Sequence, residues 1–244
     1  MQATLSRLAI YGKANLGDHR VVTTLAPPPL RTLTDLGPIA QLCAGRLGRR
    51  VVQLYAGLLL YGFSIALMVR SDLGLAPWDV LHSGLTKWFP IDIGQALVIV
   101  SFVVMLGWIP LREIPGIGTI SNAFVIGLST DVFLAVLPVT HAAGLRVVLL
   151  LAGVALQGLA TAAYIGAQLG RGPRDGLMTG LARRTGRSLR FVRTMMELTV
   201  VVLGLLLGGV AGLGTILYAL AIGPLSQAML PHLVVTTDTS GRDE

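Results

Sequence analysis

The chain has 244 residues, of which 53% are hydrophobic and 13% charged, and its formal net charge is +7. Soluble domains carry roughly 25% charged residues, so this composition excludes an ordinary soluble protein and favours an integral membrane protein. The positive charge does not indicate nucleic-acid binding, because the basic residues gather between long apolar runs, where they act as a topology signal. The single cysteine, Cys43, excludes an internal disulfide and a paired-cysteine metal site.

Residues 1–45 precede the first long apolar run and contain no apolar stretch long enough for a signal peptide. The prolines at 27–29 are incompatible with a helix at that point. We therefore expect residues 1–45 to be a mobile cytoplasmic tail, or else the product of a misassigned start codon.

Six apolar runs then follow, and runs of about 18 or more such residues match the thickness of a bilayer. They lie at 51–69, 94–111, 117–137, 145–167, 194–210 and 213–230. A shorter, partly apolar segment at 77–89 follows the first run, and a strongly basic stretch at 170–193 follows the fourth. The pattern predicts an all-α membrane protein with six transmembrane helices.

The basic residues predict the orientation of these helices. If both termini are cytoplasmic, only Arg70, Lys87 and Arg146 among the lysines and arginines fall on the other side. This asymmetry follows the positive-inside rule and predicts a multi-pass protein of the bacterial cytoplasmic (inner) membrane. Trp78 and Trp88 border the loop after the first helix, as expected for an interfacial aromatic belt.

The second half of the chain repeats the first at a fixed offset of 96 residues, which separates Asp79 from Asp175. Segments 73–79 and 169–175 both read Leu-Gly-x-x-Pro-x-Asp, and about 24 of 77 aligned pairs between 51–127 and 147–223 are identical. Each copy holds three spans, and because three is odd the second copy must enter the membrane from the opposite side. The sequence thus predicts two inverted-topology three-helix repeats, at 46–140 and 141–232, followed by a polar C-terminal tail at 233–244.

The Leu-Gly-x-x-Pro-x-Asp motif predicts a break and then a short helix after the first span of each repeat. Its glycine permits a turn, its proline starts a helix, and its aspartate faces the positive end of that helix dipole. These residues are Gly74, Pro77 and Asp79 in the first copy and Gly170, Pro173 and Asp175 in the second. Either both short helices lie on the membrane surface with the aspartates as caps, or they dip inward and their N-termini converge near the midplane.

A second repeated motif, Gly-x-Gly-Thr-Ile, occupies 116–120 and 212–216. Small residues on one helix face permit close packing, and a threonine can bond to its own or a neighbouring helix. We interpret Gly118, Thr119, Gly214 and Thr215 as packing residues, with a hinge between the repeats as the alternative.

Charged residues inside predicted spans are costly and often functional. Asp131 either lines a cavity or lies in the headgroup region, and Glu197 is placed to pair with Arg193 four residues earlier. The candidate substrate-binding residues are Asp79, Asp175, Asp131, Trp78 and Arg174. The scattered histidines lack metal-ligand spacing, and neither a nucleophile elbow nor a phosphate-binding loop is present. We therefore predict no enzymatic activity, no cofactor and no metal.

The segment 71–82, Ser-Asp-Leu-Gly-Leu-Ala-Pro-Trp-Asp-Val-Leu-His, resembles the YczE-like group of bacterial membrane proteins, which is related to the YyaS and YitT proteins. The second copy, at 170–176, is similar to that group's second motif. The resemblance covers residues 48–230 and leaves 1–45 outside. It implies an integral protein of the bacterial cytoplasmic membrane and implies no particular substrate.

The inverted repeat with paired helix breaks favours a permease or secondary-transporter-like carrier of an unknown small solute, working by alternating access. The alternative is a non-transporting membrane regulator or assembly factor that acts through a partner at the basic cytoplasmic face around 171–193. The candidate partners are the lipid bilayer, a small solute or ion, and a second copy of the chain.

Overall fold

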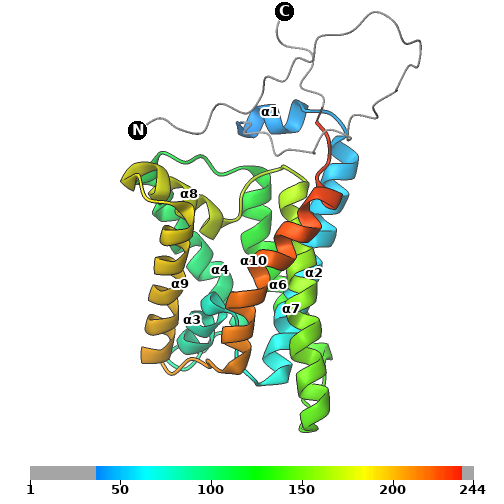
Figure 1. Cartoon of the computed structure of the whole chain (residues 1–244), viewed down its shortest axis with the longest axis vertical. Coiled ribbons are helices and arrows are strands. Elements are labelled where there is room, and N and C mark those ends of the chain that lie inside the picture. The colour runs from blue at the N-terminus through cyan, green and yellow to red at the C-terminus, as the bar shows by residue number, and fades with distance from the viewer. Residues whose placement is uncertain (1–36, 238–244) are drawn as a thin grey trace, which may run out of the picture. The chain divides into compact units, whose positions relative to one another are not determined.

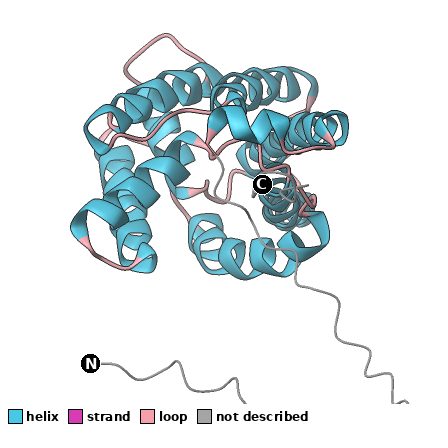
Figure 2. Ribbon diagram, turned by 90° about the horizontal axis from the view of Figure 1, so that it is seen from above, coloured by secondary structure: helices cyan, strands magenta, loops and turns pink. Residues whose placement is uncertain are grey.

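The computed structural model describes residues 37–237, which lie within one compact unit. In this part of the chain every regular element is a helix, and no strand is present (Figure 2). The helices are α1 (Pro38–Cys43), α2 (Leu47–Ser71), α3 (Pro77–Leu85), α4 (Ile93–Leu106), α5 (Trp108–Leu111), α6 (Ile117–Val136), α7 (Ala143–Gly166), α8 (Pro173–Thr185), α9 (Leu189–Leu206) and α10 (Leu213–Leu233). The predictions for residues 1–36 and 238–244 lie outside the described residues.

Five helical segments are long and apolar enough to cross a membrane: α2, α4 with α5, α6, α7 and α10. The prediction of an all-helical, multi-pass membrane protein is therefore confirmed. The remaining predicted span corresponds to α9, which has 18 residues. Helix α9 is not among the five helical segments that are apolar enough to cross a membrane, because its first half carries Arg190, Arg193 and Glu197.

The boundaries of α9 differ from those predicted from hydropathy. The apolar run begins at Thr194, but the helix begins at Leu189, because the Ser188 hydroxyl accepts a hydrogen bond from the Phe191 N–H at 3.3 Å. Such N-caps start a helix irrespective of where its apolar run begins. The helix ends at Leu206, shortly before Gly208 adopts a φ of +82°.

The helices of the second half begin at the same offset of 96 residues that relates the two sequence copies. The corresponding first residues are Leu47 and Ala143, Pro77 and Pro173, Ile93 and Leu189, and Ile117 and Leu213. The backbone at the breaks corresponds too, since Gly74 has φ +122° and Gly170 has φ +131°. The capping and turn residues are therefore repeated together with the apolar runs.

Helices α2 and α7 pack closely at the centre of the fold because glycines lie at their contact. A Cβ atom on Gly57 would lie 2.9 Å from the Tyr164 nitrogen, and one on Gly153 would lie 2.7 Å from the Met68 side chain. The adjoining core includes the fully buried Leu54 and Leu58. Small residues at such contacts let helix backbones approach, which is how helices associate in lipid.

Two arginines cap this helix pair reciprocally. The Arg50 Nε donates to the Ala167 carbonyl at the end of α7, at 2.8 Å, and the Arg146 Nε donates to the Ser71 carbonyl at the end of α2, at 2.7 Å. The last carbonyls of a helix have no partner within it, and a cation there also interacts favourably with the helix dipole. Each helix thus begins beside the capped end of the other.

The described ends of the chain pack against this core. The Gln41 carbonyl in α1 accepts from Arg50, and the Val235 N–H donates to the Gly166 carbonyl at 3.0 Å. Val234 and Val235 are each 1% exposed. Residues 38–43 of the predicted N-terminal tail are thus helical and are bound by the Arg50 side chain, and residues 234 and 235 of the predicted polar tail are buried beside the end of α7.

Candidate functional site

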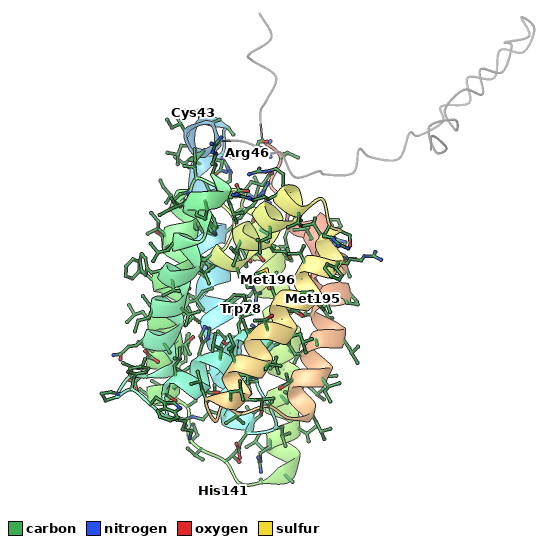
Figure 3. All side chains as sticks on the ribbon, turned by 90° about the vertical axis from the view of Figure 1, so that its left-hand side faces the viewer. Cys43, Arg46, Trp78, His141, Met195 and Met196 are labelled. Carbon is green, nitrogen blue, oxygen red and sulfur yellow. The ribbon has the colours of Figure 1, made fainter. Side chains whose placement is uncertain are left out.

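Helices α3 and α8, the short helices of the two copies, lie toward opposite ends of the bundle. Figure 1 shows α8 at the end where α1 lies and α3 in the other half. Trp78, in the first turn of α3, lies at mid-depth between Cys43 at one end and His141 at the other (Figure 3). The N-terminus of α3 therefore reaches the middle of the bundle, where polar groups on it are shielded.

Two cavities adjoin this point. The inner cavity has a volume of about 60 Å³ and is lined by residues of α2, α3, α4, α6, α7 and α8. The outer cavity has a volume of about 400 Å³ and extends from Trp78 to Gln41 of α1 and Arg171 before α8. Trp78, Arg174 and Asp175 line both cavities. The structure therefore brings four of the five candidate residues together, since Asp79 lines the inner cavity.

Asp79 is held at the inner cavity by its position in α3. Pro77 starts this helix, which places Asp79 in its first turn, 3% exposed. Its Oδ1 lies 3.0 Å from Nδ1 of His82, which is also buried. A carboxylate out of contact with water requires such a partner, because burial of an unpaired charge is strongly unfavourable.

Asp175 occupies the matching position in α8 and has different partners. The Tyr164 hydroxyl donates to its Oδ2 at 2.5 Å, and the Arg174 Nε lies 3.8 Å from its Oδ1. The Arg174 guanidinium also donates to the Tyr61 hydroxyl at 2.8 Å and lies over the Tyr61 ring, 5.8 Å from its centroid. This combination of ion pair, hydrogen bonds and cation–π contact holds Arg174 in place between the cavities.

The burial of Asp79 and the shared cavity fit the interpretation in which the two short helices converge, and not the one in which they lie on the surface. For the same reason the assignment of Trp78 to an interfacial belt was wrong: Trp78 lines both cavities and lies at mid-depth in the bundle. Trp88, by contrast, is 69% exposed, and its indole donates to the Leu207 carbonyl at 3.1 Å.

Asp131 lines neither cavity. Its Oδ1 accepts a hydrogen bond from the Gly94 N–H at 2.7 Å, in the first turn of α4. A carboxylate at that point satisfies an unpaired donor and faces the positive end of the helix dipole. The structure thus separates Asp131 from the other candidate residues and places it as a cap.

The Gly-x-Gly-Thr-Ile motifs join the two copies through their backbones. The Gly118 N–H donates to the Leu169 carbonyl and the Gly214 N–H to the Leu73 carbonyl, both at 2.8 Å. The Thr119 hydroxyl donates to the Arg171 carbonyl at 2.7 Å, while the Thr215 hydroxyl accepts from the Gly212 N–H at 3.1 Å. These contacts agree with the packing interpretation, and each motif binds the chain beside the broken segment of the other copy.

Several residues at the cavities were not selected from the sequence. His82 lies three residues after Asp79 on one helix, a spacing that places both on one face, and this was the available signal. Tyr61 and Tyr164 carry no comparable signal, because their contacts come from separate helices.

The predicted pair of Arg193 with Glu197 is confirmed at 2.9 Å, and both residues line the outer cavity. Within residues 37–237, no three His, Cys, Asp or Glu residues cluster closely enough to hold a metal ion.

The spans, and the cavities with charged residues in their walls, define a multi-pass membrane protein with charged groups between its helices. A family described as "Family of unknown function (DUF6198)" matches residues 48–231. An uncharacterized protein of Haemophilus influenzae is 42% identical over 178 residues, covering 70% of this chain and 82% of that protein.

Two Bacillus subtilis proteins are also similar. The uncharacterized membrane protein YczE is 34% identical over 183 residues, covering 74% of this chain and 85% of YczE. The uncharacterized protein YyaS is 28% identical over 179 residues, covering 72% and 89% respectively. No solved structure matches the chain. The chain belongs to the YczE-like family of membrane proteins.

Proposed function

We propose that this protein is a secondary carrier that moves a small solute by alternating access between two inverted three-helix repeats. The observation that carries the proposal is the meeting of α3 and α8, which come from opposite ends of the bundle, at one cavity lined by Asp79 and Asp175. Broken helices whose ends converge near the midplane are the recurrent solute site of such carriers. The architecture and the site together support a carrier, since a fold alone does not specify a function.

The reciprocal contacts support the inverted repeat. The hydrogen bond from Gly118 to Leu169 and that from Gly214 to Leu73 are related by the 96-residue offset with the roles of the copies exchanged. The arginine caps of α2 and α7 are exchanged in the same way. Contacts that pair i with j and j with i arise from two-fold symmetry, here an axis that relates the two halves of one chain.

Helix α9 is the sixth span in this proposal. Its 18 residues would extend about 27 Å, close to the roughly 30 Å of the hydrocarbon core. Its charged residues lie in the first half, where Arg193 and Glu197 pair with each other and line the outer cavity instead of the lipid. Charged groups within spans are tolerated when they are paired and face a cavity.

Both termini are cytoplasmic in the proposed orientation. The basic residues at the start of α2 and along α8 lie at the end of the bundle that carries α1, as the positive-inside rule requires of the cytoplasmic side (Figure 1). The outer cavity extends toward this same end. The conformation is therefore the inward-facing state of the proposed cycle.

Cysteine accessibility tests the proposal without knowledge of the solute. Ser226 lines the outer cavity and Cys43 is exposed, so the reporter is Ser226→Cys in a Cys43→Ser background. In a carrier, this cysteine reacts with a membrane-impermeant maleimide in inside-out vesicles and, more slowly, in right-side-out vesicles, because both states are visited.

The controls are the native Cys43, expected to react only from the cytoplasmic side, and Thr140→Cys in the loop before α7, expected to react only from the other side. If the Ser226→Cys reporter reacts from the cytoplasmic side alone while both controls behave as expected, alternating access is contradicted. The alternative hypothesis, a regulator that acts through the exposed arginines of α8 and the loop after it, would then be favoured.

A further inference from the structure

We propose that the outer cavity binds a small organic anion with an apolar body. Arg174 and Arg193 would hold its acid group, and Trp78, Met178 and Met196 would contact its apolar part. The inference rests on the carrier function proposed above and names the class of solute for it. The volume of the outer cavity, about 400 Å³, falls within the range of small-molecule sites.

Two arginines at this cavity, Arg174 and Arg193, have N–H groups that are not used in hydrogen bonds to the described residues. A guanidinium carries five N–H groups. Within residues 37–237 the side chain of Arg193 donates only from its Nε, to Glu197 at 2.9 Å. That of Arg174 donates to Tyr61 and lies close to Tyr218, so at most two neighbouring hydroxyls accept from it.

The carboxylates at the cavity, in contrast, already have partners. Asp175 accepts from the Tyr164 hydroxyl and lies beside Arg174, and Glu197 accepts from Arg193. A negatively charged acceptor can use the guanidinium N–H groups that remain, whereas an ammonium group cannot bind to them. Arginine is suited to this task because its planar fork binds a carboxylate through two parallel hydrogen bonds.

A buried hydroxyl at the cavity agrees with this. Thr161, 8% exposed, also lines the cavity, and its hydroxyl has no hydrogen-bond partner in the described part of the chain. Buried hydroxyls are normally satisfied, so a free one at a cavity indicates a polar ligand or bound water.

The rest of the wall selects against small inorganic anions. An indole, two thioethers and the side chains of Ile165 and Ile222 face the same space. Methionine adapts to ligands of varied shape, and apolar area of this kind favours a ligand that also buries carbon. The proposed solute class is therefore an organic anion with an aromatic or branched apolar group.

The test uses the full-length protein in detergent and three probes of one shape and different charge: phenylacetate, phenylacetamide and phenethylamine. Binding is followed by tryptophan fluorescence and by the rise in unfolding temperature. We expect saturable binding of phenylacetate, about tenfold or more weaker binding of the other two, and a loss of that preference in Arg174→Gln and Arg193→Gln. Arg190→Gln is the matched control, because Arg190 is exposed on the same helix as Arg193 and lines neither cavity.

The preference for phenylacetate over phenylacetamide is compared within each variant, so a general loss of folded protein does not imitate the result. Equal binding of the three probes, preference for phenethylamine, or no saturable binding of phenylacetate overturns the inference. Arginine-dependent binding of phenylacetate with one-sided labelling at Ser226→Cys would keep the anion site and refute the carrier. Two-sided labelling at Ser226→Cys together with a preference for phenethylamine would keep the carrier and refute the anion site.

Discussion

Asp79 and Asp175 occupy the same position in the repeated motif, yet each obtains its partner from a residue that the other copy lacks. Asp79 contacts His82, and the position equivalent to His82 in the second copy is Met178. Asp175 contacts Tyr164, and the position equivalent to Tyr164 in the first copy is Met68. The backbone breaks are therefore common to both copies, while the polar contacts at the cavity are specific to one. Symmetry accounts for the scaffold and not for the site.

We predict that Asp79→Ala destabilises the protein. The substitution leaves the buried His82 ring without its partner, which should lower the free energy of unfolding by about 1–3 kcal/mol. Denaturant unfolding in detergent would measure it. The double variant Asp79→Ala/His82→Ala should lose less than the sum of the two single variants, because the two residues are in contact. Additive losses would show that the pair does not interact.

Among the elements, α3 is held inside the bundle by glycine contacts with α9. A Cβ atom on Gly84 would lie 2.8 Å from the Gly204 carbonyl, and one on Gly204 would lie 2.6 Å from the Leu81 nitrogen. At α8, the short helix of the second copy, the first-copy equivalent of Gly204 is Trp108: its indole donates to the Pro173 carbonyl at 2.9 Å and lies against Gly176. Each short helix thus docks on the second span of the other copy, α3 on α9 and α8 on the segment formed by α4 and α5. The apolar half of α9 binds α3 while its charged half faces the outer cavity.

The second prediction concerns the course of α9. If α9 crosses the membrane, Val210→Cys in a Cys43→Ser background should react with an impermeant maleimide from the same side as Thr140→Cys. Val210 follows the end of α9 and is partly exposed, so the reagent can reach it. Reaction of Val210→Cys from the side of the native Cys43 would contradict a sixth span and place α9 at one face of the membrane.

For the molecule as a whole, the two copies are joined by the packing of α2 against α7 and by direct backbone hydrogen bonds. The Gly118 and Gly214 N–H groups bind carbonyls of the other copy directly, and no space remains for a side chain at either glycine. Association of helices in lipid depends on such close packing and on interhelical hydrogen bonds, because apolar burial offers little gain when the solvent is itself apolar. A motion of one repeat against the other would have to pass through these two contacts.

We therefore predict that Gly118→Ala and Gly214→Ala each destabilise the protein by about 1–3 kcal/mol. The added Cβ atoms would lie 2.7 Å from the Leu169 carbonyl oxygen and 2.6 Å from the Gly74 carbonyl oxygen, and backbone atoms cannot move aside cheaply. Gly223→Ala is the control on α10: no atom lies within 4 Å of its added Cβ, so helix propensity alone should make it neutral or slightly stabilising. Thermal unfolding in detergent distinguishes the three, and equal behaviour would contradict the packing role.

The class of protein, the starts of most helices and the position of both breaks were determined by the sequence alone. Each is a property of a short, continuous stretch: bilayer thickness sets the length of a span, lipid requires the backbone to be helical, and glycine and proline interrupt it. The start of α9 at Leu189 was missed because a serine cap, and not the apolar run, determines it.

Only the tertiary structure decided which polar residues share a site. It joined Asp79 and Asp175 to one cavity, added Tyr164 and His82, moved Trp78 from the expected interface to the interior, and made Asp131 a cap of α4. Apart from the contact between Asp79 and His82, which lie on one helix, these placements depend on how separate helices pack, and the order of residues along the chain does not specify that packing.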